Sequence, residues 1–174
     1  MTRARTDRLT RARWIEAGFA ALAEDGHGAL KAEPLARRLG TTKGSFYWHF
    51  RDVPEFQSAL LAAWEQQSGP PDPRDANPAA GLRALAQRMA RPDPLERALR
   101  AWSLSDDRAA AALARHDTNR QSRIAALLAA MGVANPDMAR LIGAATTGLA
   151  MQGGTADDND DTIGSLVDLI LLLR

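Results

Sequence analysis

Cysteine is absent from the 174 residues, and aromatic residues make up only 5% of them. Without thiols the chain can form no disulfide, no thiolate metal site and no cysteine nucleophile, which excludes a secreted disulfide scaffold. The longest nearly apolar run, 163–173, is interrupted by Asp168 and is shorter than the ~20 residues that cross a bilayer. The arginine-rich N-terminus lacks the apolar core of a signal peptide. We therefore expect a cytoplasmic protein with no membrane partner.

Motifs for catalysis and metal binding are also missing. The sequence contains no nucleophile elbow, phosphate-binding loop or zinc-binding helix motif, and its three histidines are scattered. The acidic run 157–161 resembles a calcium loop in composition. That loop, however, would need glycine where Thr162 stands and glutamate where Asp168 stands. We interpret the run as a solvated loop that caps the last helix, and we expect no enzyme activity, cofactor or metal.

Charge is distributed unevenly along the chain, although the formal net charge is only +1. Residues 1–51 contain ten basic and five acidic side chains, a net charge of +5, so the remainder carries −4. A basic segment on an acidic body is typical of a module that approaches phosphate groups. Chance clustering would give the same count, so the charge alone favours a nucleic-acid partner without requiring one.

Helical periodicity dominates the sequence, and no segment alternates apolar and polar residues as a half-buried strand does. Prolines and glycines separate most of the periodic segments. The pattern predicts an all-α protein with an N-terminal domain at 1–52 and a helical domain at 53–174, which contains a proline-rich linker at about 68–78. The helices are expected at about 8–23, 32–39, 42–49, 54–67, 79–90, 94–104, 107–131, 136–151 and 162–173, with Asp52 as N-cap of the fourth.

Residues 35–50 read LARRLGTTKGSFYWHF, which is two short helices joined by a glycine-containing turn, the plan of a helix-turn-helix. In such a unit the second helix enters the major groove, and its first residues reach bases or phosphates. Here those residues are Thr42, Lys43, Gly44 and Ser45. Hydroxyls and free backbone N–H groups can hold a phosphate, Lys43 adds charge, and Gly44 lets the backbone come close to DNA.

This segment resembles the DNA-binding domain of the tetracycline-repressor (TetR) family. The resemblance covers residues 8–64 and is carried by the Gly40 turn, by Gly-Ser-Phe-Tyr at 44–47 and by Trp-His-Phe at 48–50, with Arg11, Ile15, Ala17, Leu22 and Gly26 upstream. It implies a three-helix DNA-binding domain followed by a helical domain for ligand binding and dimerisation. The expected protein is a homodimeric repressor that a small, largely apolar effector releases from double-stranded operator DNA.

By the same resemblance, the DNA contacts come from Thr42, Lys43, Gly44, Ser45, Tyr47 and His49. Trp48 is included with them as a DNA-contact candidate, although its role is ambiguous. Phe46 and Phe50 are assigned to the core, because they alternate with the polar face at helical spacing. The alternative for Tyr47 and His49 is a packed ring and a surface imidazole. The sequence departs from the family pattern at two phosphate anchors, where Lys31 and Arg51 are expected to substitute. An N-terminal arm of Arg3, Arg5 and Arg8 could reach the minor groove, although a frayed terminus is the commoner outcome.

The helix at 107–131 carries two charged residues on its apolar face. Leu113, Asp117, Arg120, Ile124, Leu127 and Met131 recur at steps of three and four, so they share one side of a helix. Asp117 and Arg120 could either line an effector cavity with His116 or form a structural ion pair, and the sequence leaves both open. The predicted cavity is lined by Leu85, Met89, Trp102, Leu113, His116, Asp117, Arg120 and Met151.

The last two helices contain more small and apolar residues than a short monomer can cover. In the TetR family this helix pair forms a four-helix bundle between two protomers. The interface is expected at Leu141, Ala145, Gly148, Ile163, Leu166 and Ile170, and an ordinary monomer core is the alternative. For the whole protein, the alternative is a helical ligand-binding or interaction protein whose helix-turn-helix does not bind DNA.

Overall fold

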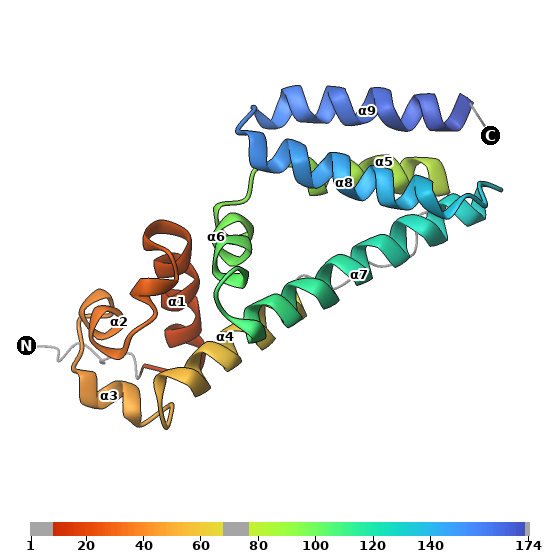
Figure 1. Ribbon diagram of the computed structural model, residues 1–174. Coiled ribbons are helices and arrows are strands. Elements are labelled where there is room, and N and C mark those ends of the chain that lie inside the picture. Colours follow the sequence, from red (N-terminus) through yellow and green to blue (C-terminus); the bar gives the residue numbers. More distant parts are fainter. Residues whose placement is uncertain (1–8, 68–76, 173–174) are drawn as a thin grey trace, which may run out of the picture. The chain divides into compact units, whose positions relative to one another are not determined.

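The computed structural model describes residues 9–67 and 77–172, and these contain helices and no β-strand (Figure 1). The all-α prediction is therefore confirmed. The arginine arm at 3–8 and most of the predicted linker lie outside the described residues. No helix in the described ranges is long and apolar enough to span a membrane. The described chain divides into two compact units, unit 1 (9–67 and 94–112) and unit 2 (77–93 and 113–172).

Unit 1 contains α1 (Arg11–Asp25), the 3-10 turn η1 (His27–Ala29), α2 (Ala32–Arg38), α3 (Lys43–Tyr47), α4 (Val53–Gln67), α6 (Pro94–Ser103) and the start of α7 (Asp107–Ala130). Side-chain caps set two of these helix starts. Thr10 accepts a hydrogen bond from the Arg13 amide at 3.3 Å, so α1 begins at Arg11. Asp52 accepts one from the Glu55 amide at 2.8 Å, as an N-cap should.

The core of unit 1 is an aromatic cluster. The Phe46 ring lies 5.4 Å from the Trp14 ring and 5.4 Å from the Phe56 ring, and Phe50 lies 5.0 Å from Phe56. Gly18 allows α1 to approach α4 closely, because a Cβ there would lie 2.6 Å from the Phe56 ring. This cluster holds α3 against α1 and α4, so tertiary contacts set the orientation of the short helix.

Helix α6 also belongs to unit 1, which therefore extends beyond the predicted boundary at residue 52. It packs against α1, with Leu99 and Trp102 buried. The Trp102 ring stacks on His27 with 6.3 Å between ring centroids and 2° between planes. Trp102 is thus a core residue of the unit that contains the helix-turn-helix.

Unit 2 contains α5 (Pro78–Ala90), α8 (Pro136–Gln152), α9 (Ala156–Leu172) and the second part of α7. Figure 1 shows α8 and α9 as antiparallel neighbours, and α5 packs against both. The core is aliphatic and includes Leu82, Leu85, Ala86, Met89, Ile124, Leu128, Ile142, Ile163, Val167 and Ile170.

Helix α9 begins six residues earlier than predicted, at Ala156. Thr155 caps it, accepting a hydrogen bond from the Asp158 amide at 3.1 Å and donating one to the Asp158 carboxylate at 2.7 Å. The acidic run 157–161 therefore forms the first turns of the helix, where negative charge favourably meets the helix dipole. The interpretation of this run as a loop is wrong. In the described ranges, no group of three or more potential ligands is placed to hold a metal ion.

Candidate nucleic-acid interface

A tight turn joins α2 to α3. Gly40 adopts φ +62°, a left-handed conformation that glycine takes without strain. The Thr41 amide then donates to the Ala36 carbonyl at 2.9 Å. Leu35 and Phe46 are completely buried, one on each helix, so the two helices pack together and the remaining faces of α3 point outward.

The outward face of α3 contains the residues that the sequence predicts to contact DNA. Thr42, Lys43, Gly44, Tyr47 and Trp48 are exposed, and Trp48 retains 88% of its accessible surface. Ser45 and His49 are partly buried. Phe46 and Phe50 lie in the core. The alternation of core and exposed side chains thus follows the predicted division.

Tyr47 and His49 combine the two alternatives considered from sequence. The Tyr47 ring packs edge-on against Phe46 at 5.3 Å, yet about half of its surface is exposed. The His49 ring lies 6.4 Å from Trp14 and is partly buried. Each ring is therefore positioned by the core and still presents an accessible side.

None of the described residues requires a glycine at position 44. Gly44 does not have a positive φ. A Cβ built there would meet only the Thr42 hydroxyl, at the ordinary contact distance of 3.7 Å. The missing side chain therefore leaves open space on the outer face of α3, where an external molecule could approach the backbone.

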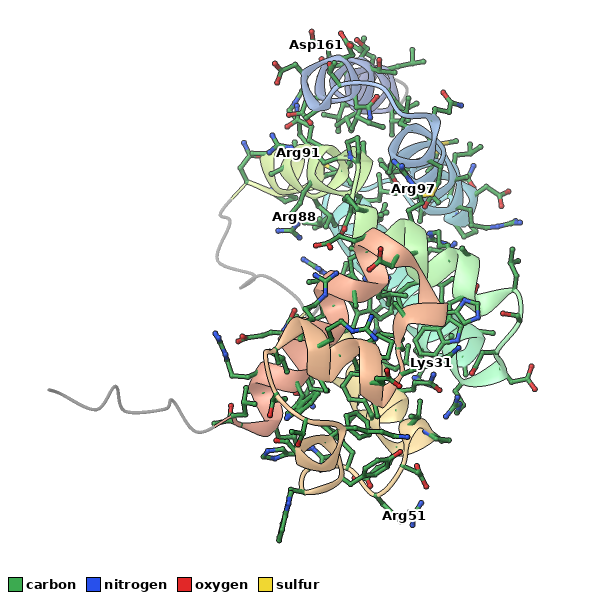
Figure 2. The ribbon with its side chains drawn as sticks, turned by 90° about the vertical axis from the view of Figure 1, so that its left-hand side faces the viewer. Lys31, Arg51, Arg88, Arg91, Arg97 and Asp161 are labelled. Carbon is green, nitrogen blue, oxygen red and sulfur yellow. The ribbon has the colours of Figure 1, made fainter. Side chains whose placement is uncertain are left out.

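The basic residues in 9–67 differ in whether a carboxylate neutralises them. The arginines are all paired: Arg11 with Glu55, Arg13 with Glu16, Arg37 with Glu33, Arg38 with Glu24 and Asp25, and Arg51 with Asp52. Lys31 and Lys43 have no ion pair within the ranges 9–67 and 77–172. Figure 2 shows the exposed side chains of Lys31 and Arg51. Within 9–67, the two lysines are therefore the cations whose charge no carboxylate of the described residues neutralises.

Arg11 makes a set of contacts that the sequence analysis did not identify. Its Nη1 donates to the His49 carbonyl at 3.1 Å and its Nη2 to Glu55 Oε1 at 3.1 Å, while the guanidinium lies 4.5 Å from the Phe50 ring centre. Glu55 Oε2 also accepts the Arg51 amide at 2.8 Å. The Arg51 amide, followed by the Arg11 guanidinium, holds the pKa of Glu55 below its usual range. These partners are 38 and 44 residues away in sequence, so no local pattern reveals them.

Seven of the eight residues predicted to line an effector cavity belong to unit 2, and Trp102 belongs to the core of unit 1. Leu85 and Met89 lie in the core of unit 2. His116 is buried, with its Nδ1 3.6 Å from Asp117 Oδ1. The others, Leu113, Asp117, Arg120 and Met151, are partly buried.

Unit 2 also brings arginines together. Burial, followed by the charges of Arg88 and Arg120, lowers the pKa of Arg123. Arg88, labelled in Figure 2, and Arg123 have no ion pair in the described part of the chain. In contrast, Arg83, Arg91 and Arg140 pair with Asp168, Asp160 and Asp137 respectively. Sequence reasoning missed Arg88 and Arg123 because they lie on different helices.

The residues predicted at a dimer interface fall into two groups. Ile163 and Ile170 are buried in the core of unit 2, so their side chains pack within the protomer. Leu141 is 56% exposed, and Ala145, Gly148 and Leu166 are partly exposed. A Cβ on Gly148 would meet no atom within 4 Å. Leu169, which was not predicted, is 53% exposed on α9.

Comparisons with known proteins agree with this architecture. Residues 15–52 match the family model described as bacterial regulatory proteins, tetR family. A transcriptional regulator from Rhodococcus sp. Rha1 has a similar structure, with a TM-score of 0.75, 19% identity and coverage of 94% of this chain and 97% of that chain. Salmonella enterica GusR matches with a TM-score of 0.70 and 17% identity over 95% and 99% of the two chains.

A third structure, a transcriptional regulator of the TetR/AcrR family from Thermobifida fusca, matches with a TM-score of 0.55 and 20% identity over 92% and 96% of the chains. The curated protein sequences contain no match. The chain therefore contains, at residues 15–52, the domain of bacterial regulatory proteins of the tetR family, and it has the fold of TetR-family transcriptional regulators.

Proposed function

We propose that this protein is a TetR-type repressor that binds operator DNA through α3 as a homodimer and leaves it when a small molecule binds unit 2. The observation that carries the proposal is the composition of the outer face of α3. No contact in the described ranges requires a glycine at position 44, and Lys43 beside it has no carboxylate partner there. Both features suit a helix that approaches a phosphate backbone in the major groove.

In this proposal, different residues between 31 and 51 make different kinds of contact with DNA. Lys31 and Lys43 bind phosphates, since no carboxylate of the described chain competes for them. Tyr47 and Trp48 offer ring faces to the sugar-phosphate backbone or to a thymine methyl group. Arg51 contributes less, because its guanidinium already pairs with Asp52 at 3.1 Å. Thr42, Ser45 and His49 make the remaining DNA contacts.

Dimerisation uses the exposed apolar side of α8 and α9. Leu141, Ala145 and Gly148 share one face of α8 at helical spacing, and Leu166 and Leu169 lie on α9. A two-fold dimer would present two copies of α3 to half-sites one helical turn apart, as repressors of this kind require.

The effector site lies among the helices of unit 2, which offers apolar side chains such as Met89 and Met151 and polar anchors at His116, Asp117 and Arg120. Trp102 is not part of this proposed site, because it lies in the core of unit 1. A ligand that carries an anionic group beside its apolar part would also interact favourably with Arg123, whose pKa is lowered by burial and by the charges of Arg88 and Arg120. Release from DNA requires that the ligand bind the conformation that cannot bind DNA more tightly than the conformation that can.

DNA binding itself can be tested by fluorescence anisotropy with a labelled duplex taken from the region upstream of the protein's own coding sequence. The wild type should bind it at least ~10³-fold more tightly than a scrambled duplex of equal composition. A Lys43→Ala, Tyr47→Ala variant should lose this binding, whereas Arg140→Gln, which changes an exposed paired arginine on α8, should keep it. Equal binding of wild type to both duplexes would contradict operator recognition and favour a helical ligand-binding protein.

A further inference from the structure

Arg11 connects α1 to the segment that follows the recognition helix. We define the α3–α4 corner as residues 48–55, which contain the last turn after α3 and the start of α4. The guanidinium reaches this corner at three places: the His49 carbonyl, the Glu55 carboxylate and the Phe50 ring. One side chain therefore contacts both ends of the corner and the aromatic ring between them.

The corner needs such support because α3 is only five residues long. A helix of this length is not stable by itself, so its orientation depends on tertiary contacts. Glu55 extends the support, since one carboxylate oxygen accepts from Arg11 and the other accepts the Arg51 amide. Asp52 in turn caps the Glu55 amide. The contacts form a connected path from α1 to the backbone beside Tyr47 and His49.

We propose that Arg11 is a positioning residue for DNA binding, which holds the α3–α4 corner so that Tyr47 and His49 keep a fixed orientation relative to α1. This role rests on the proposed function, because it assumes that α3 reads DNA. It adds a residue outside α3 whose effect on DNA affinity passes through protein contacts. Lysine cannot replace it, because a single ammonium group lacks the planar fork that donates to two acceptors at once.

A direct phosphate contact is the rival explanation, since half of the Arg11 side chain is exposed. The salt dependence of DNA binding separates the two roles. Each protein–phosphate contact that is lost reduces the slope of log Kd against log salt concentration by ~0.9. Loss of a positioning residue weakens binding without that change in slope.

Arg13 provides a matched control on the same helix. It carries the same charge, and its ion pair is a local one with Glu16 at 3.8 Å. We expect Arg11→Gln and Arg11→Lys to weaken binding to the upstream duplex about tenfold relative to Arg13→Gln, with parallel salt slopes. Binding by Arg11→Gln as tight as that of Arg13→Gln would overturn the proposal, and so would a slope shallower by about 0.9.

Hydrogen exchange tests the same role in the full-length protein without DNA. In Arg11→Gln, the amides of His49, Phe50, Arg51 and Glu55 should exchange about tenfold faster than in Arg13→Gln, while the amides of α1 and the melting temperature stay the same. Unchanged exchange at the corner, or faster exchange throughout unit 1, would overturn the positioning role. Failure of the wild type to bind the duplex would instead overturn the proposed function, so the two failures are distinguishable.

Discussion

Two glycines of unit 1, Gly18 and Gly44, differ in whether the surrounding structure has room for a side chain. Gly18 is buried where α1 meets α4, and a Cβ there would lie 2.6 Å from both Phe56 and Leu60. Gly44 is exposed, and a Cβ there would meet only the Thr42 hydroxyl at 3.7 Å. The first glycine is required by packing within the chain. The second is free of that requirement among the described residues, which is consistent with the proposed close approach of DNA.

Changing Gly44 to alanine should leave the fold intact and weaken DNA binding. The added methyl group fits the protomer, and alanine favours a helix over glycine by up to ~1 kcal/mol, so the melting temperature should stay the same or rise. DNA affinity should fall at least tenfold, because the methyl group keeps the backbone from the duplex. Gly28→Ala, at another exposed position with open space, is the control. A Gly44→Ala protein with wild-type affinity would show that DNA does not approach this backbone.

Changing Gly18 to alanine should destabilise unit 1. Phe56 is completely buried within the aromatic cluster, so its ring cannot move aside without disturbing Phe46 and Phe50. Overpacking of this kind costs ~1–3 kcal/mol in the free energy of unfolding. Urea denaturation followed by circular dichroism measures it. A variant with the stability of the wild type would mean that α1 and α4 are not packed this closely.

Individual residues divide into those the sequence could place and those it could not. Phe46 and Phe50 were assigned to the core because they alternate with polar neighbours at helical spacing, and both are buried. Arg11 could not be assigned a role, because its partners lie 38 and 44 residues away in the sequence. Periodicity reports which face of a helix is buried but not which distant carbonyl a guanidinium meets.

At the scale of elements, most helix boundaries were predictable because local chemistry sets them. Asn77 and Asn135 cap α5 and α8, and a proline follows each in the first turn. Helix α9 was the exception, since five consecutive polar residues suggested a loop. The Thr155 cap and the helix dipole stabilise those carboxylates in the first turns instead. Composition alone could not distinguish an acidic loop from an acidic helix start.

Asp106, which precedes α7, should make the stability of the fold depend on pH. The Arg108 side chain, together with the amides of Ala109 and Arg108, lowers the pKa of Asp106 from 3.8 to about 2. Because this pKa is lower in the folded state, the ionised carboxyl stabilises the fold above pH 3.8 and that stabilisation is lost as the pH falls to about 2. Asp106→Asn should therefore lose less stability than the wild type over this interval in urea titrations by circular dichroism. Equal losses would show that the carboxyl is not held ionised.

At the scale of the whole molecule, the sequence predicted the fold class but not how the helices group. Helix α6 follows the linker in sequence, yet it packs on α1 and belongs to unit 1. The same limit affects the predicted cavity, because Trp102 looks like an apolar cavity residue until its stacking on His27 is known. Which helix an apolar face covers is decided by three-dimensional packing.

The proposed dimer makes a prediction that leaves the protomer intact. Leu141 and Leu169 are each more than half exposed, so replacing both with glutamate should not disturb the core. Burying four charges in a two-fold interface is unfavourable, and the variant should be a folded monomer by light scattering. Leu104→Glu is the control, since Leu104 is 89% exposed in unit 1. A double variant with the mass of a dimer would move the interface away from this surface.

The salt dependence of DNA binding tests the central claim, that α3 binds a DNA backbone, most directly. Dissociation constants for the upstream duplex would be measured at several salt concentrations for the wild type, Lys43→Gln and the control Arg140→Gln. If Lys43 binds a phosphate, Lys43→Gln should weaken binding and reduce the slope of log Kd against log salt by ~0.9, while Arg140→Gln follows the wild type. A wild type that binds without salt dependence, or a Lys43→Gln variant with wild-type affinity and slope, would contradict the claim.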